Sequence, residues 1–229
     1  MGHVLVIENS PKWHLGRMGS WLRDAQLEAT VVRPHQGDEL PDTADDYDAV
    51  IALGGGRGVD WARDLTALLM RATASGTATL AFCSSSRDLA ATNGGTVSKL
   101  DEFTPTTRLI GRRDSAAEDP LFCIAPMGLD VVQWRHEELT HLPPQAELVA
   151  ASPYGAPEVF RLGERTWGIQ SHIELDEEMV LALGGSQQLA GRVDSMAEHF
   201  EDTWRPIIAR FANLATGRTS GQSLPILES

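Results

Sequence analysis

Short apolar runs alternate with helical patterns through the first 90 residues of the chain. Strand-like segments are expected at 3–8, 28–33, 47–54 and 78–82, with helices at about 15–26, 59–74 and from residue 84. Such alternation is typical of a parallel sheet covered on both faces by helices. Between 106 and 170, five more strand candidates follow one another with little helix, which indicates an antiparallel extension of the same sheet. The pattern predicts an α/β fold, a three-layer sandwich whose central sheet is mixed but mainly parallel.

Helical patterns return in the C-terminal part, first at 175–185 and then along an amphipathic stretch at 186–214. The last residues form a short polar stretch that is predicted to be poorly ordered. The sequence contains no internal repeat and no long linker, and a hydrophobic content of 42% is ample for one core. We therefore expect one domain over residues 1–215 and a polar tail over 216–229.

Charge and composition argue against several classes of partner. A formal net charge of −13 repels a phosphate backbone, so nucleic-acid binding is not expected. No apolar run approaches the ~18 residues that a membrane-spanning helix needs, so no membrane association is expected. Cys83 and Cys123 are too few for a disulfide framework. We expect a soluble, cytoplasmic protein with free thiols.

Cys83 follows the strand-like run "ATLAF" directly and precedes a helical pattern. In an open α/β sheet, ligands bind beyond the carboxyl ends of the strands, where helix N-termini point their amides. The helix dipole stabilises a thiolate there, and the amides can hold a developing oxyanion. A tight strand–nucleophile–helix turn requires small residues two positions away, and Ala81 and Ser85 are small. Cys83 is therefore a candidate nucleophile, and the alternative is a buried structural thiol.

Two other segments offer partners for this thiol. His172 and Glu174 follow a predicted strand, and their i, i+2 spacing places both side chains on one face of an extended chain. A carboxylate in that position can orient an imidazole and leave its other nitrogen for a thiol. The glycine-rich run at 52–58 also follows a strand, and its backbone amides could join that of Ser84 around an oxyanion. Together these segments outline a Cys-His-Glu triad.

The three segments, in this order, resemble the class I glutamine amidotransferase family, especially stand-alone members similar to the amidotransferase domain of GMP synthase. The resemblance covers roughly residues 3–185 and implies a flavodoxin-like, class I glutamine amidotransferase-like fold. It implies that Cys83 is the nucleophile, His172 the base and Glu174 the orienting acid. It also implies that the oxyanion donors are Gly55 and Ser84.

The chain departs from the family pattern around the triad. The family elbow reads Gly-x-Cys-x-Gly with a glutamine four residues after the cysteine, whereas residues 81–85 read "AFCSS" and Arg87 replaces the glutamine. Gly56 stands where the family's glycine loop has a proline. Ile173 replaces the proline between the histidine and the glutamate, and Ser171 replaces an aromatic residue.

Arg87 is the most informative departure, because it lies one helical turn after Cys83 and can point toward the same pocket. A guanidinium is always charged and favours carboxylate or phosphate. The hypothesis is an acyl donor other than free glutamine that carries an anion, with γ-glutamyl derivatives as candidates. The alternative is that Arg87 pairs with Asp88, Asp64 or another acid.

The segment 134–141 has two histidines and two glutamates but lacks the His-Glu-x-x-His spacing, so neither a metal nor a cofactor is expected. In the resembling family this segment is a loop near the site. The candidate substrate-binding residues are Gly54, Gly56, Arg87, His136 and Ser171.

The predicted function is hydrolysis or transfer at an amide carbonyl through an acyl-enzyme. The expected substrate is a small amide or acyl compound. If the donor is glutamine, a separate ammonia-accepting synthase is a candidate partner. Two alternatives stay open: a γ-glutamyl hydrolase-type enzyme, and a non-catalytic relative that binds a metabolite or a partner protein.

Overall fold

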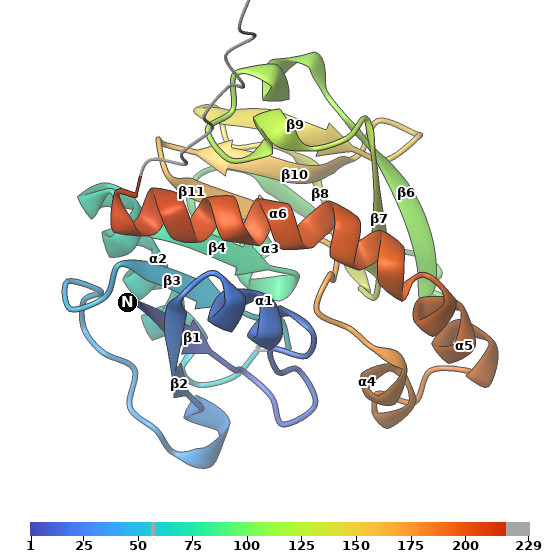
Figure 1. The fold of residues 1–229 in the computed structure, drawn as a ribbon, viewed down its shortest axis with the longest axis horizontal. Helices are drawn as coiled ribbons and strands as arrows, with labels where there is room; N and C mark the ends of the chain where they lie inside the picture. Colours follow the sequence, from blue (N-terminus) through green and yellow to red (C-terminus); the bar gives the residue numbers. More distant parts are fainter. Residues whose placement is uncertain (56–57, 219–229) are drawn as a thin grey trace, which may run out of the picture.

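A computed structural model describes residues 1–55 and 58–218 of the 229-residue chain, and its centre is one continuous mixed sheet (Figure 1). Nine strands form this sheet: β1 (Gly2–Ile7), β2 (Leu27–Val32), β3 (Ala49–Ala52), β4 (Ala78–Phe82), β6 (Thr106–Arg112), β7 (Gly128–Gln133), β9 (Ala146–Ala151), β10 (Pro157–Leu162) and β11 (Thr166–Ile169). Their spatial order is β2-β1-β3-β4-β11-β10-β9-β6-β7.

The direction of the strands divides the sheet into two halves. The pairs from β2 through β1, β3 and β4 to β11 are parallel, and those from β11 through β10, β9 and β6 to β7 are antiparallel. The parallel strands come mostly from the first half of the chain, where the sequence alternates strand and helix. The predicted α/β sandwich with an antiparallel extension is confirmed.

In residues 1–55 and 58–218, the α-helices are α1 (Met18–Asp24), α2 (Ala62–Ser75), α3 (Ser84–Thr92), α4 (Glu177–Ala182), α5 (Gln187–Ser195) and α6 (Ala197–Thr216). Helix α6 crosses one face of the sheet beside α1, while α2 and α3 pack on the opposite face (Figure 1). Three short 3-10 helices lie in the connections: η1 (Pro34–Gln36), η2 (Asp114–Ala117) and η3 (Phe122–Ile124).

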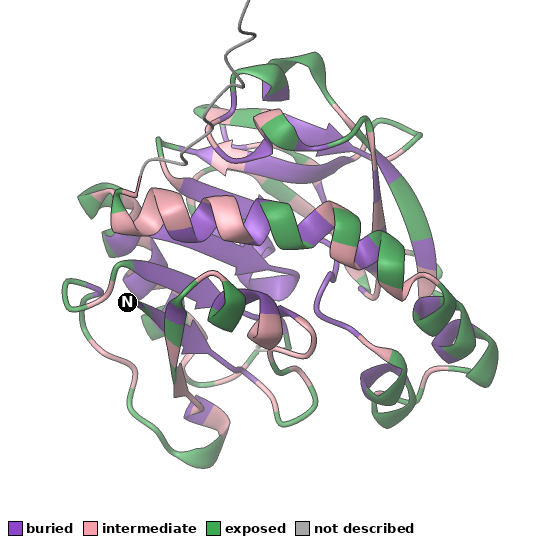
Figure 2. Ribbon diagram, in the orientation of Figure 1, coloured by how far each residue is buried: buried purple, intermediate pink, exposed green. Residues whose placement is uncertain are grey.

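Alternation along the buried strands explains the two layers of core. In β1, Val4 and Val6 belong to the hydrophobic cluster under α1 and α6, whereas Leu5 and Ile7 belong to the cluster under α2. Successive side chains of a strand point to opposite faces, so a strand covered on both faces must be apolar throughout. Figure 2 shows these central strands buried between exposed outer surfaces of the helices.

Three features differ from the sequence-based expectation. A small antiparallel sheet joins β5 (Thr96–Lys99) to β8 (Glu137–His141), so part of the expected loop at 134–141 is a strand. Both strands are short and polar, and they carry no apolar alternation that would predict them. The helical stretch at 186–214 is two helices, because α5 ends at Ser195 and α6 begins at Ala197.

The C-terminal boundary also shifts slightly. Helix α6 extends to Thr216, past the expected domain end at 215, and Gly217 follows in a left-handed conformation. Most of the predicted tail, 219–229, lies outside the described residues.

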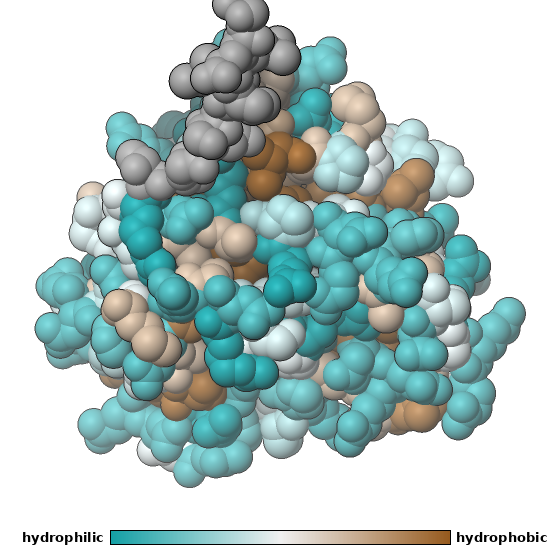
Figure 3. Space-filling model, viewed as in Figure 1, coloured by the Kyte–Doolittle hydropathy of each residue, from teal (hydrophilic) through white to brown (hydrophobic). Residues whose placement is uncertain are grey.

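The surface that carries α6 is mainly hydrophilic, with small separate hydrophobic areas (Figure 3). Within residues 1–55 and 58–218, the helices are all too short or too polar to cross a bilayer.

Candidate active site

Cys83 occupies a sharp turn between β4 and α3. Strand β4 ends at Phe82, α3 begins at Ser84, and Cys83 between them has φ 51° and ψ −115°. In the described part of the chain, Gln26 is the only other non-glycine residue with a positive φ. Such a conformation is strained, and it is the geometry of a nucleophile elbow. The Cys83 amide donates a hydrogen bond to the carbonyl of Ile169 at 2.8 Å, which ties the elbow to the end of β11.

His172 lies three residues after β11, and its backbone is fixed by β7. The His172 amide donates to the Val132 carbonyl at 2.8 Å, and the Val132 amide donates to the His172 carbonyl at 2.9 Å. On the side chain, Nδ1 lies 2.6 Å from Oε1 of Glu174. Oε2 of Glu174 accepts a hydrogen bond from the Ile173 amide at 2.9 Å. Both side chains are fully buried, so the carboxylate holds the imidazole in one orientation.

Gly54 shows how closely the thiol and the imidazole approach each other. A Cβ atom added at Gly54 would lie 3.2 Å from Sγ of Cys83 and 3.3 Å from Cε1 of His172. Both groups therefore flank a single glycine, and a side chain there would displace one of them. The structure thus places Cys83 and the His172–Glu174 pair around one glycine, while Nε2 of His172 has no hydrogen-bond partner among the described residues.

The charges around the thiol favour an ion pair. Burial raises the pKa of Cys83, but the positive charges of His172 and Arg87 lower it by more than burial raises it. The result is a pKa of about 6. Burial lowers the pKa of His172, whereas the charges of Glu174 and of the Cys83 thiolate raise it to about 10. These two shifts favour a thiolate beside an imidazolium at neutral pH.

A cavity of about 420 Å³ opens beside the sulfur. It is lined by Trp13, Gly55, Cys83, Ser84, Arg87, Trp134, Arg135, His136, Glu137 and Leu183. Four predicted site residues besides the cysteine thus line it: Gly55, Ser84, Arg87 and His136.

Two other predicted substrate-binding residues are placed differently. Gly54 lies against the thiol and the imidazole and does not line the cavity. The fully buried Ser171 does not line it either, and its hydroxyl donates a hydrogen bond to Glu158 at 2.8 Å. The hydroxyl of Ser171 is thus turned toward a buried carboxylate and away from the cavity beside Cys83. Gly56 lies outside the described residues.

Trp13 covers the imidazole. Its indole stacks on the His172 ring, and its edge meets the ring of Trp134 with centroids 5.9 Å apart. Gly55 has φ 89°, and a Cβ atom there would lie 2.5 Å from Cδ1 of Trp13. Glycine is needed at position 55 for both reasons, since the backbone is left-handed and the indole occupies the space.

Arg87 is buried beside the thiol, with only 4% of its surface exposed. Its Nη2 donates to Sγ of Cys83 at 3.7 Å. Within residues 1–55 and 58–218, its Nε and Nη1 atoms are buried without a hydrogen-bond partner. Arg87 also lines the cavity that holds the sulfur.

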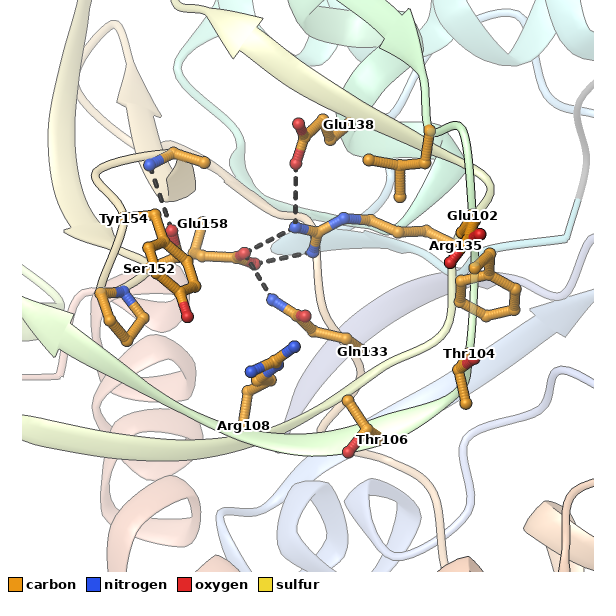
Figure 4. Close-up of a pocket in the computed structure, with 14 residues that line it drawn as sticks. Glu102, Thr104, Thr106, Arg108, Gln133, Arg135, Glu138, Ser152, Tyr154 and Glu158 are labelled. Carbon is orange, nitrogen blue, oxygen red and sulfur yellow. Dashed lines mark hydrogen bonds and ion pairs between the residues drawn. The ribbon is translucent and has the colours of Figure 1, made fainter.

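Arg135, which the sequence analysis did not single out, lines both this cavity and a second one of about 560 Å³. Figure 4 shows its guanidinium pointing at Glu158, with Glu138 and Gln133 on either side. Glu158 is fully buried and accepts hydrogen bonds from Gln133, from both Nη atoms of Arg135 and from Ser171, at distances of 2.6–2.8 Å. The Glu158 carboxylate thus links Arg135 in the cavity wall to Ser171, the residue before His172.

His136 comes from the segment with two histidines and two glutamates. Its ring packs on Phe103 with centroids 4.4 Å apart, and it also lines the cavity beside Cys83. In the described part of the chain, no group of three histidine, cysteine or acidic side chains is arranged to hold a metal ion.

Comparison with known proteins identifies the fold. A glutamine amidotransferase from Thermotoga maritima is 19% identical, with a TM-score of 0.78 over 92% of this chain and 98% of that one. A glutamine amidotransferase from Methylobacillus flagellatus is 22% identical, with a TM-score of 0.71 over 95% of this chain and 94% of that one. A protein from Thermoplasma acidophilum described as a candidate GMP synthase component is 16% identical, with a TM-score of 0.65 over 95% of each chain.

At this level of identity, the likeness concerns the fold. No protein-family model and no curated protein matches the sequence. The agreement extends over nearly the whole length of both chains, and it includes the mixed sheet and its flanking helices. The chain therefore has the class I glutamine amidotransferase fold that the sequence resemblance predicts.

Proposed function

We propose that this chain is a cysteine-dependent amide hydrolase or amidotransferase of the class I glutamine amidotransferase type. The observation that carries the proposal is the site of Cys83, a thiol on a strained elbow beside an imidazole that Glu174 orients. A structural cysteine needs neither the strained backbone nor a pKa of about 6.

In the first step, the Cys83 thiolate attacks the amide carbon and a carbon–sulfur bond forms. The carbonyl oxygen becomes an oxyanion, for which the backbone amides of Gly55 and Ser84, at the cavity wall, are the proposed donors. The carbon–nitrogen bond then breaks, and the His172 imidazolium gives its proton to the leaving amine. The products of this step are a free amine, a neutral imidazole and a thioester.

In the second step, water replaces the amine. His172 takes a proton from the water as the oxygen attacks the thioester carbon, and the sulfur leaves as thiolate. The acid is released and the thiolate–imidazolium pair is restored. Glu174 keeps Nδ1 of His172 oriented throughout both steps.

The fate of the nitrogen depends on the acyl donor. With glutamine as donor, the leaving group is ammonia, and a separate synthase would accept it. One protein of the same fold is a candidate component of a GMP synthase, which supports a synthase as partner. A cytoplasmic location stays a prediction.

The test is a screen of glutamine, γ-glutamyl amides and small anionic amides for release of ammonia or amine. We expect turnover of at least one class, and we expect Cys83→Ala to lower kcat by roughly 10⁴-fold or more. Wild-type turnover by Cys83→Ala would falsify the mechanism. Absence of turnover on all three classes, together with slow labelling of Cys83, would favour a non-catalytic relative.

A γ-glutamyl hydrolase-type activity is the second candidate, and Arg87 is the observation that favours it. The family pattern has a glutamine at this position, whereas a buried guanidinium favours an anion. A γ-glutamyl amide whose amine part carries a carboxylate supplies an anion that free glutamine lacks. Release of free amine from γ-glutamyl amides in preference to glutamine would distinguish this candidate.

A further inference from the structure

The guanidinium of Arg87 is a buried cation to which the described residues offer no carboxylate partner. Nη2 contacts the Cys83 sulfur, while Nε and Nη1 have no hydrogen-bond partner in the described part of the chain. A buried charge is stable only when another group compensates it. In the resting site, the group placed to do so is the Cys83 thiolate.

The reaction removes this compensation. When the thiolate becomes a thioester, the sulfur loses its negative charge while Arg87 keeps its positive charge. The imidazolium also loses its charge, since its proton leaves with the amine. Glu174 stays hydrogen-bonded to Nδ1 of His172 and keeps its charge, but the negative charge in contact with Arg87 is gone. A substrate anion beside Arg87 would restore it.

The other charged groups of the cavity do not replace that anion. Arg135 adds a second positive charge, and both of its Nη atoms are already bonded to Glu158. Glu137 lines the cavity too, but it is partly exposed to solvent, which weakens its field. Among the described residues of the wall, His136 also carries no negative charge.

We propose that Arg87 binds a carboxylate of the acyl donor, so that the preferred substrate is an amide with a net negative charge. This inference rests on the proposed function and specifies its substrate class. Glutamine carries an ammonium group beside its carboxylate and has no net charge. An amide monocarboxylate such as succinamate supplies the anion alone, and its diamide counterpart, succinamide, supplies none.

The experiment compares the labelling of Cys83 by iodoacetate and by iodoacetamide. Both reagents form a carbon–sulfur bond with the thiolate and release iodide. Because both react with the same thiolate, a change in the pKa of Cys83 cancels in the ratio of the two rates. The two reagents are close in size and differ by one negative charge. The proteins are the wild type, Arg87→Gln, Arg87→Lys and the control Arg192→Gln, which removes an exposed arginine on α5.

We expect the iodoacetate-to-iodoacetamide ratio of the wild type to exceed that of a free small thiol by about tenfold or more. Arg87→Gln lowers the ratio to near that of the free thiol, Arg87→Lys keeps most of it, and Arg192→Gln leaves it unchanged. Equal ratios in the wild type and a folded Arg87→Gln protein would overturn the proposal.

A second measurement uses the wild type alone, in case Arg87→Gln does not fold. Succinamate is expected to protect Cys83 from iodoacetamide at a concentration about tenfold lower than succinamide does. Protection at equal concentrations would also overturn the proposal.

Neither measurement requires turnover. If Cys83 shows no preference for iodoacetate but the protein hydrolyses amides, the proposed anion site is wrong and the proposed function stands. If Cys83 prefers iodoacetate but the protein hydrolyses none of the amides, the anion site is supported and the proposed function is contradicted.

Discussion

The indole of Trp13 stacks on the imidazole of His172, with ring centroids 4.3 Å apart and planes inclined by 24°. An aromatic face stabilises a cation placed over it, so this contact favours the imidazolium. We predict that Trp13→Ala raises the pKa of the Cys83 thiol, because a less stable imidazolium stabilises the thiolate less. A contact of about 1 kcal/mol corresponds to roughly 0.7 of a pKa unit.

The pH dependence of iodoacetamide labelling measures this change. Trp13→Phe is the matched control, because it keeps an aromatic face over the ring and should retain most of the effect. An unaltered thiol pKa in Trp13→Ala would show that the stack only fills space.

The labelling of wild-type Cys83 should follow a thiol with a pKa of about 6. A group whose pKa is lowered stays ionised above that lower value, so the rate rises around pH 6 and is level by about pH 7.5. An unperturbed thiol is still rising near pH 8.5. Cys123, a half-buried free cysteine in the same chain, is an internal comparison when labelled peptides are quantified by mass spectrometry.

Amide turnover should also have an upper pH limit, because its first step needs the imidazolium as well as the thiolate. The thiolate is present above a pH of about 6 and the imidazolium below about 10, so kcat/KM should show a broad plateau between them. Labelling of Cys83 that still increases steeply between pH 8 and pH 9 would contradict the ion pair.

Gly54→Ala should impair activity and, because it overpacks a buried site, should also lower the free energy of unfolding by about 1–3 kcal/mol. The new Cβ would lie 2.8 Å from Cβ of Cys83, closer than real Cβ contacts, and 3.3 Å from Cε1 of His172. Displacing reacting groups by about 1 Å reduces rates by roughly 100-fold, and we expect a loss in kcat of that size.

The control for Gly54→Ala is Gly191→Ala, at a helical glycine with nothing within 4 Å of the added Cβ. It should leave turnover unchanged and raise the free energy of unfolding by about 1 kcal/mol, because alanine favours helix. Turnover of Gly54→Ala at the wild-type rate would contradict the placement of the thiol and the imidazole.

Glu158→Gln should destabilise the protein strongly. The substitution keeps the shape of the side chain but leaves the buried Arg135 guanidinium with only the partly exposed Glu138 as anion, at 3.8 Å. Breaking a buried pair in this way lowers the free energy of unfolding by about 3–5 kcal/mol, which urea denaturation can measure.

Two further variants test the origin of that loss. Asp24→Asn removes one partner of the exposed Arg205–Asp24 pair and should change stability by less than about 1 kcal/mol. Adding Arg135→Met to Glu158→Gln should recover part of the loss, since the orphaned charge is then gone. If Glu158→Gln were as mild as Asp24→Asn, the ion pair would not anchor the cavity wall.

Local sequence patterns predicted much of the fold and the outline of the site. Strand β4 and the start of α3 fall where the sequence predicts them, because a strand buried on both faces reads as one apolar run that ends at Cys83. The spacing of His172 and Glu174 likewise predicts their contact, since both residues lie on one short extended segment. Strands β5 and β8 were missed because polar residues on a small exposed sheet carry no alternation.

By itself, the sequence determined the layers of the fold, the candidate nucleophile and the His172–Glu174 pair, because each of these depends on neighbours a few positions apart in the chain. Only the tertiary structure decided that Trp13 covers His172, that Arg135 meets Glu158, and that Arg87 is buried against the sulfur. Trp13 and His172, in particular, are far apart in the sequence and meet only when the strands assemble into one sheet. Whether a buried charge has a partner is likewise decided only in the assembled sheet. The packing of the elements around the site determines which groups are shielded from water and which face each other.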